Sequence, residues 1–169
     1  NIRTQQEKIR LLHVKQNGRI CMSELLEKAR SYEAKKIAAT DKESKPLFHI
    51  SAPAGWINDP NGFSVYNGKI HLFYQYYPYL REWGPMHWGH STTSDMIKWE
   101  QLPCALAPDE EYDKKGCFSG SAIEADGKHV LVYTGVTRIK LPDGSEQERQ
   151  NQCIAFGDGL NYVKHENNP

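Results

Sequence analysis

With 169 residues, the chain is long enough for one ordinary domain core or for the opening part of a larger fold. Its 21 basic side chains balance its 21 acidic ones, so it lacks the excess positive charge that nucleic-acid binding requires. No apolar run approaches membrane-spanning length and the first ten residues lack the pattern of a signal peptide, so a soluble protein that does not enter membranes is expected.

The four cysteines are Cys21, Cys104, Cys117 and Cys153. They form no Cys-x-x-Cys pair and are too sparse for a small fold held together by disulfides. Buried free thiols in a reducing cytosol are therefore expected, and with them a cytoplasmic location.

Residues 1–45 are predicted to form an N-terminal extension with one helix. Between Ser23 and Ala39 apolar residues recur at roughly helical spacing, and Glu24 precedes Lys28 by one helical turn. A polar linker, TDKESKP, follows. Met22 can serve as a natural start, so the residues before it are expected to be a leader or a non-native segment.

From residue 46 onward, short aromatic and β-branched runs alternate with two-residue turns, a pattern typical of antiparallel strands. Asn67-Gly68, between FSVY and KIHLFYQYY, is the dipeptide most typical of a tight hairpin. Further strands are predicted at HWGHSTT (87–93), IKWEQL (97–102), FSGSAIE (118–124), HVLVYTG (129–135) and NQCIAF (151–156).

Two of these patterns recur about 60 residues later: NGKIHLFYQ resembles DGKHVLVYTG, and SDMIKWE resembles GDGLNYVK. A repeat of about 60 residues that holds about four strands is typical of a β-propeller blade, and an antiparallel sandwich with coincidental hairpins is the alternative. Residues 46–169 suffice for about two such units, whereas propellers close with about four to eight blades. This segment is therefore predicted to be the N-terminal part of a propeller in a larger protein.

The segment GWINDPNGF places a carboxylate, Asp59, among turn-forming residues between Trp56 and a strand expected from Phe63. By itself, N-D-P-N-G is more typical of a plain Asx turn. At the start of an inner propeller strand, however, Asp59 would face the central channel, held ionised by neighbouring amides. A carboxylate in that position can act as the nucleophile at the anomeric carbon of a sugar.

The chain resembles glycoside hydrolase family 32, the β-fructofuranosidases that include invertases, sucrose-6-phosphate hydrolases and fructanases. The resemblance runs from about His49 to the C-terminus through WINDPNG, FYQ (73–75), WGPMHWGHSTTSDMIKW (83–99), LPCALAPDEEYDKKGCFSGSA (102–122) and VYTG (132–135). It implies an all-β fold, a five-bladed propeller followed by a β-sandwich. This chain is then expected to hold only the N-terminal blades, preceded by the helical extension.

The resemblance also implies roles for individual residues. It assigns the catalytic nucleophile to Asp59 and the binding of fructose hydroxyls to Asn58. The resemblance further implies that the fructosyl subsite is lined by Gln75, Trp83, Phe118 and Ser119. From the residues alone, a solvent-facing strand position is the better explanation of Gln75. Trp83, followed by Gly-Pro in a loop, suits stacking on the apolar face of a sugar.

Other polar and aromatic residues nearby have structural interpretations. Trp88, inside a strand, is expected to pack in the core. His87 and His90 are an odd number of positions apart and should lie on opposite faces of a strand rather than share a metal ion. The acidic run from Asp109 to Asp113 lacks the spacing of a calcium-binding loop and is expected to be solvated. No metal and no cofactor are predicted, because carboxyl groups supply the chemistry of glycoside hydrolysis.

Two motifs that the family requires do not occur in this chain. One is an Arg-Asp-Pro whose aspartate stabilises the transition state, and the other is a Glu-Cys whose glutamate is the acid/base. Truncation explains their absence better than divergence does, so the chain alone is expected to be inactive. The expected function of the whole protein is retaining hydrolysis of sucrose or sucrose 6-phosphate. A fructanase acting on levan or inulin and a non-catalytic carbohydrate-binding fragment are the alternatives.

The choice between sucrose and its 6-phosphate stays open at this point. A phosphate subsite needs Arg or Lys near the pocket, and Arg81, Lys114 and Lys115 are available. The sequence has no signal for the oligomeric state.

Overall fold

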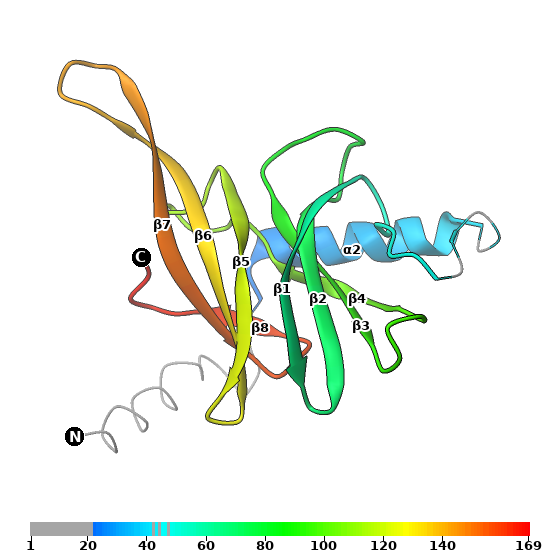
Figure 1. The fold of residues 1–169 in the computed structure, drawn as a ribbon. Coiled ribbons are helices and arrows are strands. Elements are labelled where there is room, and N and C mark those ends of the chain that lie inside the picture. Colours follow the sequence, from blue (N-terminus) through cyan, green and yellow to red (C-terminus); the bar gives the residue numbers. More distant parts are fainter. Residues whose placement is uncertain (1–21, 42, 44, 47) are drawn as a thin grey trace.

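The computed structural model describes residues 22–41, 43, 45–46 and 48–169 (Figure 1). The predicted leader, Cys21 and part of the predicted linker lie outside the described residues. The helix and strands of the described part are α2 (Glu24–Ala39), β1 (Trp56–Tyr66), β2 (Lys69–Tyr77), β3 (His87–Thr93), β4 (Glu100–Leu106), β5 (Gly116–Ala125), β6 (Lys128–Lys140), β7 (Glu146–Gly157) and β8 (Tyr162–Lys164). Within this part, no helix combines the length and apolarity needed to cross a membrane.

The strands form two four-stranded antiparallel sheets. Each keeps its strands in chain order, β1-β2-β3-β4 in the first sheet and β5-β6-β7-β8 in the second. Each sheet is therefore a meander, the arrangement predicted for a propeller blade. The first strands of the two sheets, β1 and β5, lie side by side (Figure 1).

The predicted repeat is confirmed in its turns. Asn67-Gly68 joins β1 to β2, and Asp126-Gly127 joins β5 to β6; all of these residues have positive φ, as type I′ hairpins require. Asp95 follows the third strand of the first sheet, and Asp158 follows the third strand of the second. The Oδ1 of each aspartate accepts hydrogen bonds from the backbone N–H groups two and three residues later. The same local chemistry thus shapes equivalent turns in both sheets.

β1 starts earlier than predicted. It begins at Trp56, so the segment expected to be a tight turn before a strand from Phe63 lies inside the strand. Two register shifts in its pairing with β2 accommodate the extra residues as bulges. Pro60 is tolerated because β1 is an edge strand of its sheet. Gly62 has φ +58°, and a Cβ there would lie 2.6 Å from the Phe73 ring.

The other strand boundaries also shift. The strand expected at 97–102 is β4, which begins at Glu100, because the Asp95 carboxylate holds the N–H groups of Ile97 and Lys98 in a turn. β6 and β7 run beyond their predicted apolar cores. Their ladder continues through polar positions as far as the pair Lys140 and Glu146.

A hydrophobic core lies between the two sheets. Phe73 and Trp88 of the first sheet pack with Leu131 and Tyr133 of the second. The three cysteines in the described part, Cys104, Cys117 and Cys153, are buried and free, as predicted. The core therefore fixes the two sheets against each other at β2, β3, β5 and β6.

The predicted helix is confirmed as α2, which begins after the N-cap residue Ser23. The Ser23 hydroxyl accepts a hydrogen bond from the Leu26 N–H at 3.2 Å. Leu26 and Ala29 form the buried face and pack with Tyr74 and Tyr76. The helix runs along β4, the outer strand of the first sheet (Figure 1).

Two polar side chains of α2 cover the edge of β4. Glu33 Oε2 accepts a hydrogen bond from the Cys104 N–H, and Arg30 Nε donates one to the Cys104 carbonyl, both at 2.9 Å. These bonds satisfy backbone groups that an edge strand otherwise leaves open. Arg30 also donates to the Leu160 carbonyl and to Asn161 Oδ1, in the turn that joins β7 to β8 of the second sheet. The helix therefore binds both sheets at their outer rim.

The acidic run is only partly solvated, so the expectation of a solvated loop is wrong for its two aspartates. Glu110 and Glu111 are exposed. Asp113 is fully buried and, like Asp109, forms an ion pair with Lys164 on β8. The lysine that neutralises the run comes from a distant strand, and spacing within the run gives no sign of it.

Candidate active site

Asp59 lies in a bulge of β1. The pairing of β1 with β2 shifts register between Asn58 and Pro60, which leaves Asp59 without a partner in the ladder. A bulge turns its extra residue away from the regular alternation of a strand. The side chain of Asp59 is exposed.

Ser119 lies at the corresponding place in the second sheet. The pairing of β5 with β6 shifts register between Phe118 and Ser121, so Ser119 also sits in a bulge. The Ser119 hydroxyl donates a hydrogen bond to Asp59 Oδ2 at 3.4 Å, between positions 60 residues apart. Asp59 and Ser119 therefore meet across the junction of the two sheets.

The chain on either side of Asp59 is held by local hydrogen bonds. Trp56 Nε1 donates to Asn58 Oδ1 at 2.7 Å, and Asn61 Nδ2 donates to the Asp59 carbonyl at 3.1 Å. The amides near Asp59 thus bind backbone and an indole rather than its carboxylate. The sequence gives no local signal for the hydrogen bond from Trp56 to Asn58, because Trp56 looks like an ordinary apolar residue.

Gln75 and Trp88 connect the first sheet to β5. Gln75, opposite Asn58 in the ladder, is 3 % exposed, and its Nε2 donates to the Cys117 carbonyl at 2.9 Å. Gln75 is therefore not a solvent-facing residue. Trp88 is fully buried, as predicted, and its Nε1 donates to the Phe118 carbonyl at 3.1 Å. These two bonds fix the backbone immediately before Ser119 against the first sheet.

Trp83 presents an exposed aromatic surface near the same strand. Its side chain is 57 % exposed and packs edge-to-face on Phe118, with ring centroids 6.2 Å apart. An indole supported in this way is suited to contact the apolar face of a sugar.

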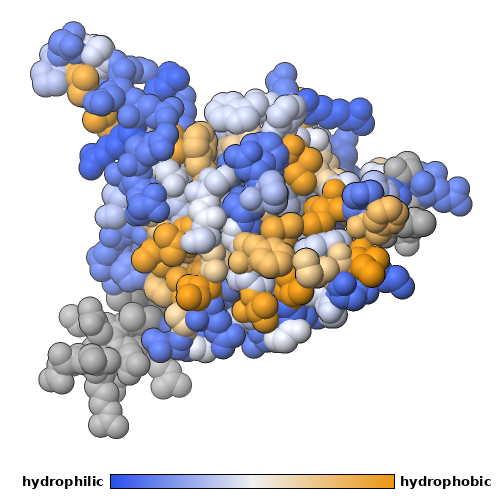
Figure 2. Space-filling view, in the orientation of Figure 1, coloured by the Kyte–Doolittle hydropathy of each residue, from blue (hydrophilic) through white to orange (hydrophobic). Residues whose placement is uncertain are grey.

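Asn58 and Asp59 also border an apolar hollow of about 510 Å³. The residues that complete its walls are Phe48, His49, Ile50, Ile57, Pro60, Leu72, Tyr74 and Trp99. Figure 2 shows apolar side chains gathered on the face over β1, where Phe63 and Val65 are exposed as well. Ser119 and Trp83 do not line this hollow, so it brings together only two of the predicted site residues, Asn58 and Asp59.

The histidines of β3 have separate partners. His87 Nδ1 lies 2.9 Å from the Pro85 carbonyl, and His90 Nε2 lies 2.9 Å from His71 Nδ1. In the part of the chain that the structure describes, no group of three or more His, Cys, Asp or Glu could hold a metal ion.

Comparison with known proteins places this site in a family. Residues 49–169 match the family model of the glycosyl hydrolases family 32 N-terminal domain. The sucrose-6-phosphate hydrolase of Escherichia coli is 48 % identical over 120 residues, which are 70 % of this chain and 25 % of that protein. The levanase of Bacillus subtilis (strain 168) is 40 % identical over 149 residues, 86 % of this chain and 22 % of that protein. The chain thus spans about a quarter or less of the length of these curated relatives.

Solved structures agree with the family model. The GH32 β-fructofuranosidase of Bombyx mori is 46 % identical, with a TM-score of 0.73 over 85 % of this chain and 30 % of that chain. A mutant of the same enzyme in complex with sucrose is 45 % identical with the same TM-score. These structural relatives are five-bladed β-propellers, and the two sheets of this chain correspond to N-terminal blades of that fold, as predicted. The family model matches more than half of the chain, and the chain belongs to glycosyl hydrolase family 32.

Proposed function

We propose that the protein carrying this chain hydrolyses the β-fructofuranosidic bond of sucrose or sucrose 6-phosphate with retention, and that Asp59 is its nucleophile. The observation that carries this proposal is the hydrogen bond from Ser119 to the Asp59 carboxylate across the two sheets. It keeps an exposed carboxylate oriented at the junction of two blades. The names of the sucrose-6-phosphate hydrolase and β-fructofuranosidase relatives support the substrate class.

The reaction follows from the chemistry of a carboxylate and a carboxylic acid. An Asp59 oxygen attacks C2 of the fructosyl unit and forms an ester while the bond from C2 to the glucosyl oxygen breaks. The departing oxygen takes a proton from the acid, which the family resemblance assigns to a glutamate that this chain does not contain. Water then cleaves the ester, with the same glutamate as base, and releases fructose. No cofactor takes part.

We assign the fructosyl contacts to five side chains around Asp59. They are Asn58, Gln75, Trp83, Phe118 and Ser119. The exposed indole of Trp83, packed on Phe118, supports a platform for the sugar ring. Gln75 holds β5 through its amide nitrogen, so its contribution combines support of the strand with contact to the sugar.

We also propose a cytoplasmic location and a catalytic domain that begins at residue 46, with residues 1–45 as an extension. Three buried free thiols in the described part support a reducing compartment. The binding of α2 to both sheets supports an extension that docks on the catalytic domain.

Fructan hydrolysis is the second candidate. The levanase relative aligns over 86 % of this chain, more than the 70 % of the sucrose-6-phosphate hydrolase. Assays of the same preparation with sucrose, sucrose 6-phosphate and levan separate the two, and the proposal expects the highest kcat/KM with one of the sucrose forms.

The test of the nucleophile is Asp59→Asn in the protein expressed from its complete reading frame. The amide is nearly isosteric but cannot form the glycosyl ester, so kcat for sucrose should fall by several orders of magnitude with an unchanged melting temperature. Asp126→Asn is the matched control, because Asn-Gly serves a type I′ hairpin as well as Asp-Gly does. Activity of Asp59→Asn within tenfold of wild type would remove Asp59 from this role.

A further inference from the structure

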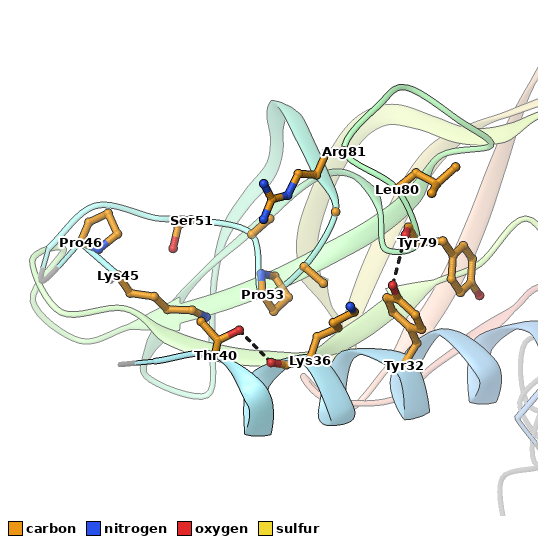
Figure 3. Close-up of a pocket in the computed structure, with 13 residues that line it drawn as sticks. Tyr32, Lys36, Thr40, Lys45, Pro46, Ser51, Pro53, Tyr79, Leu80 and Arg81 are labelled. Carbon is orange, nitrogen blue, oxygen red and sulfur yellow. Dashed lines mark hydrogen bonds between the residues drawn. The ribbon is translucent and has the colours of Figure 1, made fainter. Parts of the chain in front are cut away.

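A cavity of about 360 Å³ lies apart from Asp59, between α2 and two loops (Figure 3). One loop leads into β1 and contributes Ser51, Pro53 and Gly55. The other follows β2 and contributes Tyr79 and Arg81. The volume falls in the range of small-molecule sites.

All charged side chains among the described residues that line this cavity are basic. Lys36 comes from α2, Lys45 from the loop before β1 and Arg81 from the loop after β2, and Figure 3 shows them around one opening. The ion pairs recorded among the described residues involve none of the three. Because the chain as a whole has no net charge, this local excess is not a consequence of composition. Three like charges around one hollow repel one another, and an anion bound among them would offset this repulsion.

The side chains suit a phosphate monoester in particular. The guanidinium of Arg81 offers the planar fork that binds phosphate oxygens in pairs, and the two lysines supply point charges. Tyr32 and Pro53 add apolar wall to the same cavity. An aromatic and apolar wall beside basic groups fits a sugar that carries a phosphate, and the volume exceeds what phosphate alone needs.

Of the three cations that the sequence offered for a phosphate subsite, Arg81 lines this cavity. Lys114 instead pairs with Glu111 at 2.5 Å in the connection before β5. Lys115 belongs to the same connection, and neither is among the lining residues.

The cavity is joined directly to the strand of the proposed nucleophile. Gly55 forms part of its wall and immediately precedes β1. A Cβ at Gly55 would lie 2.0 Å from the Tyr77 carbonyl, so this wall is packed tightly on the end of β2. Asp59 follows Gly55 by four residues, which span at most about 14 Å of extended chain.

We propose that this cavity binds the phosphate group of a sugar phosphate. The inference rests on the proposed function only for the identity of the sugar: the phosphate is either the 6-phosphate of the substrate or that of a separate sugar phosphate. Both sources share the same recognition by Lys36, Lys45 and Arg81.

Binding is tested with glucose 6-phosphate and with inorganic phosphate, each titrated by calorimetry into the complete protein, with glucose as the uncharged comparison. Wild type should bind both phosphates, and the double variant Lys36→Gln/Arg81→Gln should bind them at least tenfold more weakly. Lys35→Gln, on the same helix but outside the cavity, is the matched control and should bind as wild type does. Absence of phosphate binding in wild type, or equal binding by wild type and the double variant, overturns the proposal.

Kinetics then identify the source of the phosphate. If it belongs to the substrate, the ratio of kcat/KM for sucrose 6-phosphate to that for sucrose falls at least tenfold in the double variant and stays constant in Lys35→Gln. If it belongs to a separate sugar phosphate, this ratio is unchanged while glucose 6-phosphate binding is lost. Failure of the complete protein to hydrolyse either sugar refutes the proposed function. The titrations then still test whether the cavity binds phosphate.

Discussion

Replacing Glu33 by Gln should strengthen the docking of α2 at neutral and alkaline pH. Glu33 is 3 % exposed, its Oε2 accepts the Cys104 N–H at 2.9 Å, and its Oε1 is buried without a hydrogen-bond partner among the described residues. Burial raises the pKa of this carboxyl from 4.5 to about 7, although the Cys104 N–H, the nearby Tyr76 hydroxyl and the Arg30 guanidinium favour its charged form. The carboxylate therefore costs stability when it ionises.

The sign and size of the effect follow from linkage. The pKa of Glu33 is higher in the docked state, so its contribution to docking is full below pH 4.5 and is lost as the pH rises to about 7. At about 1.4 kcal/mol per pKa unit, this shift amounts to about 3 kcal/mol, or more than a hundredfold in the opening constant of α2. Glutamine keeps an acceptor for the Cys104 N–H and carries no charge, so its contribution does not change with pH.

Hydrogen exchange of peptides from residues 24–39, measured by mass spectrometry in the complete protein, reports this opening directly. Wild type and Glu33→Gln are compared at pH 5 and at pH 8, so that the intrinsic exchange rate cancels at each pH. The ratio of the wild-type to the variant opening constant should rise about 70-fold from pH 5 to pH 8, because wild type weakens while the part of the effect below pH 5 lies outside this range. Glu27→Gln, at an exposed position of the same helix, should show no such change.

Buried histidines act in the opposite direction and cancel in this comparison. Burial lowers the pKa of His87 and of His129 to about 4, so the stability that they contribute is present above pH 6.5 and is lost as the pH falls toward 4. Both proteins contain them. A wild-type to variant ratio that is equal at pH 5 and pH 8 would refute the reasoning about Glu33.

Two stability predictions follow from the packing. Gly62→Ala should destabilise the fold more than Gly68→Ala. Both glycines have positive φ, which costs alanine about 1–2 kcal/mol of stability, but only at Gly62 would the new Cβ meet a ring, that of Phe73 at 2.6 Å. Equal losses of melting temperature in the two variants would contradict this. Lys164→Met removes the partner of two largely buried carboxylates and should cost about 3–5 kcal/mol, whereas Lys69→Met breaks an exposed pair and should cost at most about 1 kcal/mol, in denaturant unfolding. A small loss for Lys164→Met would show that these aspartates are already stabilised by other groups.

The turns of the fold were predictable because their determinants are local. Asn67-Gly68 and Asp126-Gly127 adopt positive φ readily, and Asp95 and Asp158 capture N–H groups only two and three residues away. Each of these signals fits within a few residues, so it can be recognised in sequence. The same local rules misjudged the start of β1, because pairing with β2 overrode the turn-forming tendency of Pro60 and its neighbours.

The contacts that assemble the candidate site were not predictable from local patterns. Gln75 alternates in a strand as a solvent-facing residue would, yet it is buried against the Cys117 carbonyl, because a second sheet covers that face. The pairing of Asp113 with Lys164 is likewise a contact between distant segments. Asp59 could be singled out because a carboxylate between large apolar residues is unusual, but its partner Ser119 was found only through the family motif.

The two sheets repeat one scaffold and differ where the chemistry is proposed. Asp59 and Ser119 occupy equivalent bulges in equivalent first strands, and the bond between them means that the second sheet completes the site of the first. The spacing of the sheets therefore sets the orientation of the Asp59 carboxylate. Trp88 fixes that spacing near the site through the Phe118 carbonyl, and Arg30 fixes it at the outer rim by holding backbone groups of both sheets. A substitution of Trp88 would act on Asp59 without touching it, because Trp88 holds the strand that carries Ser119 against the first sheet.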